Sequence, residues 1–339
     1  MSGKIICFGE LLLRLGAPGQ QLLLQTPTLD VHVGGAEANV AVSMARFGHA
    51  ARMVGAVADN ALGHAALGEL RRHGVDVSDV QSVPGRMGLY FLTTGALHRP
   101  SEVLYDRADS AFVRAGGGRH DWPALCAGSD WLHVSGITPA LGEVSANAVL
   151  EAMRAARQAG CKVSFDGNYR PSLWQSWAGD APRLLRAIMA EADLLFASHR
   201  DMQVVLGHEV REDTAEQRFA AGARAAFEAF PHLSQMTATI RDSDSVQQQS
   251  LAGITALRDG RLLQTRRYTL AGVIDRIGTG DAFAAGVLHG AIEGMPVEQA
   301  LQFGVAAGCL KHSVPGDFNW MGMADVDAFL ADGGVDVKR

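Results

Sequence analysis

Apolar positions along the chain follow two spacings, short continuous runs and stripes at helical intervals. Residues 4–15 form an apolar run that then partly alternates, which is typical of a strand that begins in a core and continues toward an edge. Residues 36–48 follow a glycine pair, carry small or apolar side chains at helical spacing and end at Gly48, a residue type that terminates helices. Residues 51–58 and 61–74 repeat the order of strand and helix. The pattern therefore predicts βαβ units.

The same alternation fills the second half of the chain. Because each expected strand is followed by a helix, the strands should run parallel with helices on both faces, an α/β fold with a doubly wound, mostly parallel sheet. Residues 235–270 break the pattern and predict only short strands with an edge hairpin or two. The further elements are strands at 129–136, 161–168 and 193–198 and helices at 145–160, 182–192, 214–230, 281–294 and 297–312.

A hairpin interrupts the βαβ order in the first half. Residues 86–107 hold two β-rich runs around a turn, with no helix between them. Together with the stretch at 11–33, they predict a small second sheet beside the main one. We therefore predict a single domain over residues 1–339, with the strands of a small lid inserted at about 11–33 and 86–108. Residues 116–121 are expected to form a flexible loop, and residues 335–339 to fray.

Composition and charge narrow the class of protein. The 339 residues are 47% hydrophobic and 19% charged, as in soluble globular proteins. The net charge is −6 and no run of Lys and Arg marks a surface for nucleic acid. No run of 18 apolar residues is present to cross a membrane, and the four cysteines are too far apart for a paired motif. We expect a cytoplasmic protein that binds neither nucleic acid nor membrane.

Candidate chemistry is concentrated where a helix begins after two glycines. Gly278 and Gly280 permit a turn free of side chains, and a helix rich in small residues follows, so unpaired N–H groups converge there. Such a helix start binds anions, and Asp281 adds a carboxylate beside it. A packing turn and a simple helix cap are the alternatives. A dinucleotide fingerprint is excluded because its third glycine would fall at Phe283, and no Walker loop occurs.

Several segments resemble the signatures of the ribokinase-like (pfkB) carbohydrate kinases. GTGDAFAAG, from Gly278, is similar to the second signature, and GGAEANVA, at residues 34–41, is similar to the first. The similar segments span residues 5 to about 320, and the chain is identified as a member of this family. The resemblance implies a ribokinase-like fold with a β-sheet lid, ATP as phosphate donor and Mg²⁺. Further similar segments are VGAVADNALG from Val54, HVSGITPAL from His133 and FDGNYR from Phe165.

Within the family, the chain most resembles the kinases of 2-keto-3-deoxygluconate. The resemblance implies an ATP-dependent phosphotransferase that phosphorylates the terminal hydroxyl of this sugar acid to give the 6-phosphate. The galacto epimer, a neutral sugar such as fructose or ribose, and a nucleoside stay open as substrates. A non-catalytic sugar-acid sensor is the alternative of a different class. The resemblance lies in GGAEANVA, in Tyr105-Asp106-Arg107, in residues 166–171 and in LKHSVPGDFN at residues 310–319.

The resemblance also implies roles for individual residues. Asp281 takes the proton of the substrate hydroxyl, and Arg107 and Arg170 are the candidates to pair with the carboxylate of a sugar acid. Mg²⁺ enters with ATP and few protein ligands, and no residue is assigned to it. The anion hole is assigned to Gly278, Thr279, Gly280 and Ala282. Substrate contacts are assigned to Gly35, Tyr90, Tyr105, Arg107, Arg170, Asp281 and Asp317, and nucleotide contacts to Asn168, Arg170, Arg241, Gly278 and Gly280.

Two segments depart from the family pattern. Where Asn-x-x-Glu is usual and helps to order Mg²⁺, this chain has Ser198-His199-Arg200-Asp201, in which Asp201 is a shorter substitute. Where a glycine-containing nucleotide loop is usual, residues 239–245 contain no glycine, and Arg241 either supplies charge instead or is a solvated loop arginine. Glu37 is explained by the helix dipole, which a first-turn acid stabilises. The edge strands of the lid predict a homo-oligomer, a dimer or larger.

Overall fold

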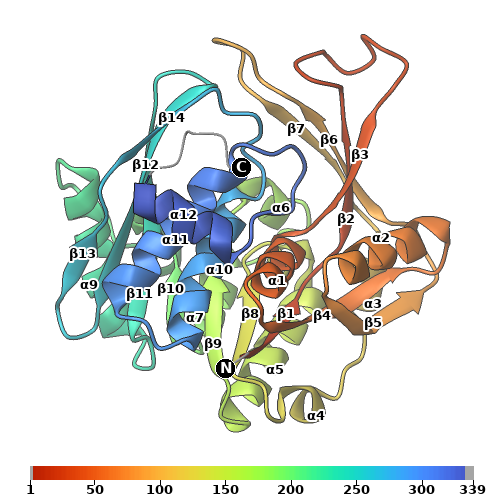
Figure 1. The fold of residues 1–339 in the computed structure, drawn as a ribbon. Coiled ribbons are helices and arrows are strands. Elements are labelled where there is room, and N and C mark those ends of the chain that lie inside the picture. Colours follow the sequence, from red (N-terminus) through yellow and green to blue (C-terminus); the bar gives the residue numbers. More distant parts are fainter. Residues whose placement is uncertain (1–2, 333–339) are drawn as a thin grey trace.

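A computed structural model describes residues 3–332, and its centre is a large, mostly parallel sheet (Figure 1). In the described part, ten strands form this sheet, with nine in the order β13-β12-β11-β10-β9-β8-β1-β4-β5 and β14 paired with β12. The pairs from β5 to β11 are parallel, and those of β12 are antiparallel. The strands are β1 (Lys4–Phe8), β4 (Ala50–Ala58), β5 (Asp76–Val83), β8 (Trp131–Ser135), β9 (Lys162–Asp166), β10 (Leu194–Phe196), β11 (Gln235–Ser243), β12 (Gln248–Leu257), β13 (Leu262–Gln264) and β14 (Tyr268–Ala271).

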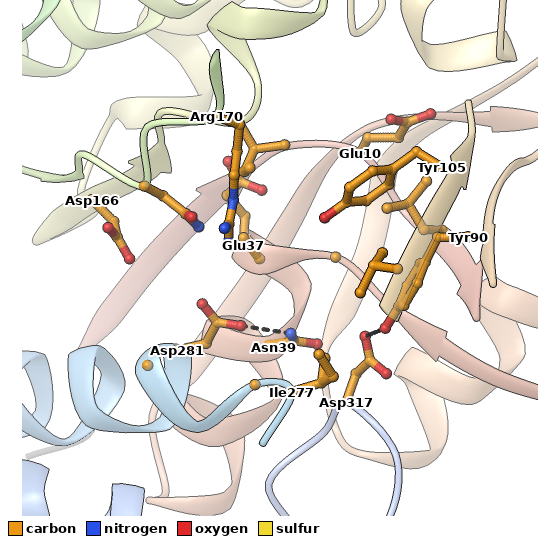
Figure 2. Close-up of a pocket in the computed structure, with 18 of the residues that line it drawn as sticks. Glu10, Glu37, Asn39, Tyr90, Tyr105, Asp166, Arg170, Ile277, Asp281 and Asp317 are labelled. Atoms are coloured by element: carbon orange, nitrogen blue, oxygen red, sulfur yellow. Dashed lines mark hydrogen bonds between the residues drawn. The ribbon is translucent and has the colours of Figure 1, made fainter. Parts of the chain in front are cut away.

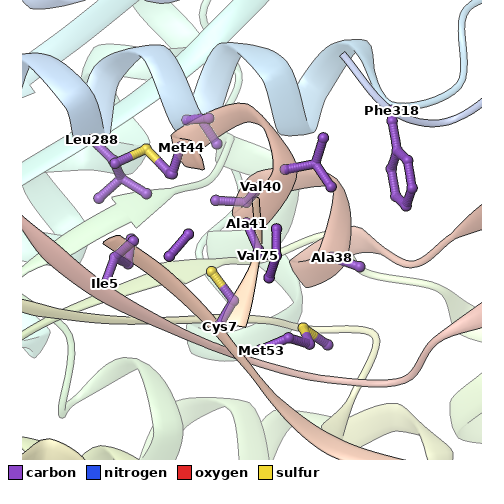
Figure 3. Packing of buried hydrophobic residues seen from close by; sticks show 14 of the residues in the cluster. Ile5, Cys7, Ala38, Val40, Ala41, Met44, Met53, Val75, Leu288 and Phe318 are labelled. Carbon is purple, nitrogen blue, oxygen red and sulfur yellow. The ribbon is translucent and has the colours of Figure 1, made fainter. Parts of the chain in front are cut away.

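Helices cover both faces of this sheet, and β1 shows why. Ile5 and Cys7 point into one apolar cluster, whereas Ile6 and Phe8 point into another, because successive side chains of a strand alternate between faces. The first cluster includes residues of α1, α2, α10 and α11. Figure 3 shows Met44 of α1 beside Leu288 of α10 in this cluster. The second includes α5, α7 and α9. The helices are α1 (Ala36–Arg46), α2 (Ala61–Arg72), α3 (Ala111–Ala115), α4 (Trp122–Cys126), α5 (Glu143–Gln158), α6 (Pro171–Gln175), α7 (Ala181–Met189), α8 (His199–Leu206), α9 (Ala215–Ala229), α10 (Thr279–Ile292), α11 (Val297–Lys311) and α12 (Met323–Asp332).

A small second sheet projects from one end of the main sheet (Figure 1). Its order is β3-β2-β6-β7, with β2 (Leu12–Gly16) parallel to β6 (Gly88–Thr93) and antiparallel to β3 (Asp30–Gly34), while β7 (Glu102–Asp106) closes the far side. We call these four strands the lid sheet. The predicted fold class, a mostly parallel sheet flanked by helices with a small β-sheet beside it, is confirmed.

Two close approaches of backbone position the helix that carries the glycine-rich turn. Gly286 of α10 meets Gly304 of α11, where an added Cβ would lie 2.6 Å from the Gly304 Cα. The small residues of these helices therefore allow α10 and α11 to pack closely. Gly278, at φ +77°, precedes α10, and its Cα lies against the Asp317 carbonyl. The Asp317 contact thus sets the start of α10, and the packing on α11 sets its middle.

Several local predictions need correction. The run at 4–15 is two strands in two different sheets, because the chain leaves the main sheet at Gly9 and enters the lid sheet at Leu12. Residues 235–257 form an antiparallel hairpin, as expected, but its strands β11 and β12 are long, and only β13 and β14 are short. The loop at 116–121 includes Gly117, which packs against the Phe8 ring, so it belongs to the core boundary. Residues 335–339, expected to fray, lie outside the described residues.

The pattern also missed β5 and the short helices α3, α4, α6 and α8, whose few residues give too little periodicity to detect. None of the helices between residues 3 and 332 has the length and apolar character that a bilayer crossing requires.

Candidate active site

A pocket of about 310 Å³ lies where the lid sheet meets the carboxyl ends of the central strands (Figure 2). Glu10 follows β1 and Asp166 ends β9, so two central strands deliver acids to its wall. Tyr90 and Tyr105, directly paired across β6 and β7, reach it from the lid sheet. The start of α10, with Asp281, faces them. Open α/β sheets bind ligands at this edge, where strand ends and loops present polar groups.

Asp281 lies in the first turn of α10 and is oriented by a single amide. The Asn39 side chain donates from Nδ2 to Asp281 Oδ2 at 2.6 Å, and the second carboxylate oxygen has no partner in the described part of the chain (Figure 2). Burial raises the pKa of Asp281 to about 7, with the Glu37 charge adding to the effect and the Asn39 hydrogen bond opposing it. A carboxylate with this pKa accepts a proton efficiently near neutral pH.

The amides at the start of α10 form a donor site beside Asp281. The first N–H groups of a helix lack acceptors within it, and those of Gly280 and Asp281 bond to no described residue. Ala282 differs, because its N–H donates to the Gly278 carbonyl at 2.9 Å. The assignment of Ala282 to the anion hole is therefore wrong. The helix begins at Thr279, two residues earlier than the sequence pattern indicates, so the Ala282 amide is already inside the helical ladder.

The lid sheet contributes a hydroxyl that is fixed by a second acid. Tyr90 is 5% exposed, and its OH donates to Asp317 Oδ2 at 2.5 Å. Burial and the Asp317 charge raise the pKa of Tyr90 far above its ordinary value, so the hydroxyl stays protonated. Tyr105, next to it on the pocket wall, is 41% exposed and makes a ring contact with Tyr90. The two tyrosines therefore line a wall rather than only pack the hairpin.

The two arginines predicted to bind a substrate carboxylate are in different states. Arg107 is buried and paired with Glu10, to which its Nε donates at 3.0 Å. Ser110 also donates to Glu10, so the Glu10 carboxylate accepts hydrogen bonds from both Arg107 and Ser110. Arg170 has no carboxylate partner in the described chain, and Figure 2 shows its side chain pointing into the pocket. Arg170 is thus a pocket cation without an ion pair in the described chain, although its charge acts on Asp166 and Asp281.

Glu37 has a larger role than its predicted one. It is 1% exposed, and its Oε1 accepts three hydrogen bonds of 2.8 Å, from the Ser135 amide, the Ser135 hydroxyl and the Thr138 hydroxyl. Burial raises the pKa of Glu37 in spite of these bonds. The helix dipole alone does not explain this residue, because the carboxylate ties α1 to the turn after β8. Glu37 also lines the pocket near Asp281.

Two further acids crowd the same region. The pKa of Asp166 is raised well above its usual value by burial and by the charges of Asp281 and Asp201. Asp201 caps α8, where its Oδ2 accepts from the Ser198 amide at 2.7 Å and from the Ser198 hydroxyl at 2.9 Å. Within residues 3–332, no three His, Cys, Asp or Glu side chains are grouped as a metal ligand set. Closely spaced acids without a full ligand set fit Mg²⁺, which is usually held by one or two carboxylates, phosphates and water.

On the far side of the α10 start, two arginines lie close together without an acid between them. Arg241 donates from Nη2 to the Thr279 hydroxyl at 3.2 Å. Burial and the Arg276 charge lower the pKa of Arg241 to about 10. The segment expected to be a nucleotide loop is part of β11 up to Ser243, so Arg241 projects from a strand and not from a solvated loop. Neither arginine forms an ion pair in the described chain, an arrangement suited to phosphate.

The pocket brings together most of the predicted site. Asn168, Gly278 and Gly280 line it alongside the substrate set, whereas Thr279 and Arg241 lie behind the α10 start. Glu10, Asn39, Asp166 and Arg276 are pocket residues that sequence reasoning missed. The substrate residues that line the pocket are Gly35, Tyr90, Tyr105, Arg107, Arg170, Asp281 and Asp317, which is all of those assigned.

Comparisons with known proteins agree with these observations. The model of the pfkB family carbohydrate kinases matches residues 2–227 and 257–319. A 2-dehydro-3-deoxygalactonokinase of Haloferax volcanii is 32% identical over 341 residues, covering 100% of both chains. A 2-dehydro-3-deoxygluconokinase of Bacillus subtilis is 30% identical, covering 93% of this chain and 91% of that protein.

Solved structures give the same result. The crystal structure of 2-dehydro-3-deoxygluconokinase from Thermotoga maritima has a TM-score of 0.90 at 35% identity, covering 96% of this chain and 99% of that one. The part of the chain between the two matched ranges, 228–256, contains most of the β11–β12 hairpin and with it the atypical residues 239–245. The departure from the family pattern is therefore local.

Proposed function

Since the chain belongs to the pfkB family of carbohydrate kinases, we propose that it transfers the γ-phosphoryl group of ATP to the terminal hydroxyl of a 2-keto-3-deoxy sugar acid. The substrate we propose is 2-keto-3-deoxygluconate, also called 2-dehydro-3-deoxygluconate, and the product is its 6-phosphate. Named relatives from Bacillus subtilis and Thermotoga maritima support this choice.

One observation carries the proposal. Asp281, with a pKa of about 7, lies at a helix start with free amides, and Arg170 points into the same pocket without an acid partner. The helix start suits a phosphoryl group, while the arginine suits a carboxylate on the acceptor. A neutral sugar would give Arg170 no carboxylate to pair with, and only the charges of Asp166 and Asp281, which form no ion pair with it, would act on it. A sensor would have no use for a carboxylate whose pKa is tuned for proton transfer.

The pocket suggests how its residues divide the reaction. Arg170 pairs with the substrate carboxylate, and Tyr90 and Tyr105 bind the sugar chain from the lid side. Asp281 accepts the proton of the terminal hydroxyl through the oxygen that Asn39 leaves free, which makes that hydroxyl a better nucleophile. The Gly280 and Asp281 amides stabilise the charge that develops on the transferred group. Arg241 and Arg276 hold the phosphates on the nucleotide side.

Mg²⁺ fits at the rim of this pocket. When bound, it neutralises phosphate charge and orients the phosphates for transfer. Asp166, at the end of β9, is the carboxylate best placed to hold its water shell, because it has no hydrogen-bond partner among the described residues and its charge is crowded by Asp281 and Asp201. Asp201 is committed to its helix cap and is not assigned to the ion.

The galacto epimer is the second candidate substrate. The Haloferax volcanii relative, named for this epimer, matches the whole chain at 32% identity. The two sugar acids share the carboxylate and the terminal hydroxyl, so Arg170 and Asp281 serve both. They differ in one inverted hydroxyl, which the tyrosine wall must distinguish.

A substrate panel tests the proposal. ADP release with Mg·ATP should be measured against both 2-keto-3-deoxy acids, gluconate, fructose, ribose and adenosine. We expect turnover confined to the keto-deoxy acids and faster with the gluco epimer. Faster turnover of the galacto epimer would reverse the substrate assignment, and turnover of a neutral sugar would refute the role of Arg170. Binding of the sugar acid without any turnover would favour the sensor.

The outer face of the lid sheet supports a homo-oligomer. Val31, Leu15, Phe91 and Leu104 are directly paired across the four strands and form one apolar row. Val31 is 59% exposed and Leu104 is 63% exposed. Burying this row against the same row of a second copy would remove it from water, and the exposed edge strands would gain a neighbour. We therefore propose a dimer joined through the lid sheets.

A further inference from the structure

Arg14 is a buried lid residue that reaches into the main domain. It lies at the centre of β2, paired with His32 on one side and Tyr90 on the other, so these three side chains share the inner face of the lid sheet. Arg14 is only 5% exposed. A buried guanidinium is costly unless charged partners surround it.

Two carboxylates from two separate loops hold the guanidinium. Arg14 Nη2 lies 2.6 Å from Asp275 Oδ2, and Nη1 lies 3.2 Å from Asp317 Oδ1. Asp275 comes from the loop before α10, while Asp317 comes from the loop after α11. These acids are 6% and 3% exposed. Arg14 is therefore a bridge between the lid and both loops.

Each of these carboxylates also contacts groups of the candidate active site or the backbone beside it. Asp275 Oδ1 accepts from the Ile277 amide at 2.9 Å, and Asp275 Oδ2 accepts from the Gly316 amide at 3.0 Å. Asp317 accepts the Tyr90 hydroxyl. The Asp317 carbonyl also lies so close to Gly278 that a Cβ added there would be 2.0 Å from it. The backbone that precedes the anion hole is thus set by the same two acids that Arg14 clamps.

The charges balance only with Arg14 present. Lys311, fully buried, donates to the Val314 carbonyl at 3.1 Å and lies beside the Gly278 turn. Arg14 and Lys311 together match Asp275 and Asp317. Without Arg14, two buried carboxylates would share one lysine, and the loops would separate or one acid would take up a proton.

We propose that Arg14 is a positioning residue that couples the lid sheet to the anion hole, so that the Gly278–Gly280 turn reaches its catalytic geometry only when the lid covers the pocket. This inference rests on the proposed kinase function. In this proposal Arg14 acts through two acids. It positions Tyr90 through Asp317, and it positions the start of α10 through Asp275. Errors in this geometry reduce the rate of phosphoryl transfer strongly, because a misplacement of about 1 Å lowers a rate by a factor of roughly 10².

The test compares Arg14→Ala with Arg52→Ala. Arg52 also pairs with two carboxylates, Asp76 at 3.0 Å and Asp79 at 3.2 Å, but on the surface of the main sheet. Steady-state kinetics with Mg·ATP and the sugar acid should give a kcat for Arg14→Ala about 10²-fold below wild type, with a smaller change in KM for ATP. Arg52→Ala should match wild type. A kcat for Arg14→Ala within twofold of wild type would overturn the proposal.

Chemical rescue separates positioning from loss of fold. Methylguanidinium at millimolar concentration should occupy the space left in Arg14→Ala and raise its kcat severalfold, while leaving wild type and Arg52→Ala unchanged. If the variant were merely unfolded, a guanidinium compound would lower activity further, because such compounds weaken hydrophobic and peptide burial. Failure of rescue in a folded Arg14→Ala therefore overturns the coupling role.

A second variant covers the case in which Arg14→Ala does not fold. Arg14→Lys keeps the charge but loses the planar fork that spans two carboxylates. If folded Arg14→Lys has a lowered kcat, the proposal stands, and if its kcat equals that of wild type, the proposal fails. Wild-type turnover is measured in parallel. Absence of turnover in wild type would refute the kinase function itself, which distinguishes that failure from failure of the Arg14 inference.

Discussion

Replacing Asn39 with alanine should move the acidic limb of the kcat profile to higher pH. Asp281 acts as a base only when ionised, and its pKa of about 7 means that roughly a tenth of the enzyme is active at pH 6 and roughly nine tenths at pH 8. The Asn39 amide donates to the Asp281 carboxylate at 2.6 Å and so lowers this pKa. Without this hydrogen bond, a larger fraction of Asp281 is protonated at pH 7, and kcat at pH 7 falls.

The size of the shift follows from the bond that is lost. A hydrogen bond to a charged group contributes about 1.5 to 3 kcal/mol, and one pH unit corresponds to about 1.4 kcal/mol. The limb should therefore move up by about one to two pH units. The Asn39 side-chain oxygen has no partner in the described chain, so the substitution breaks no further hydrogen bond of that side chain.

The assay measures kcat at saturating substrates from about pH 5.5 to about pH 9, a range that brackets a pKa of about 7. Asn60→Ala is the matched control, because Asn60 caps α2 on the surface and its loss should lower stability without moving the profile. ATP and sugar acid titrate identically in all assays, so a difference between profiles belongs to the protein. If the Asn39→Ala profile superposes on that of wild type, Asp281 is not the titrating base.

Three further substitutions test other parts of the site and the surface. Arg170→Met should raise KM for the sugar acid by about tenfold or more, since a hydrogen bond between charged groups contributes about 1.5 to 3 kcal/mol, while Arg183→Met, at an exposed arginine outside the pocket, should not; an equal rise for a neutral sugar would contradict the carboxylate role. Gly278→Ala should lose far more kcat than Gly294→Ala, because both have positive φ but only Gly278 abuts a carbonyl; equal losses would show that strain alone matters. Leu104→Glu should convert the dimer to a monomer in light scattering, whereas Leu262→Glu, on an exposed strand elsewhere, should not; a monomeric wild type would refute the lid interface.

The sequence was sufficient for the βαβ layout and for a helix start within two residues of Asp281, because both depend on local periodicity and on glycine placement. Gly278 and Gly280 mark the turn whatever the rest of the chain does. The single strand predicted at 4–15 was wrong for a physical reason. Apolar alternation continues through the point at which the chain changes sheets, and nothing local marks Gly9 as the crossing.

The residues that sequence reasoning missed are those defined by distant partners. Arg14 pairs with acids 261 and 303 positions away, and Glu10 pairs with Arg107 at a separation of 97. In the sequence, Arg14 is only a polar position in an alternating strand. Glu37 likewise has the spacing of a helix first-turn acid, and its bonds to Ser135 and Thr138 depend on how β8 packs beside α1. Only the folded chain brings these charges together.

Direct identification of the product tests the central claim most sharply. Wild type and Asp281→Asn should be incubated with Mg·ATP and 2-keto-3-deoxygluconate, and the products examined by ³¹P NMR and mass spectrometry. We predict a phosphomonoester coupled to the terminal CH₂ protons with wild type, and a rate about 10² to 10⁴ lower with Asp281→Asn. Inorganic phosphate without a sugar phosphate, or equal product from both proteins, would contradict the account.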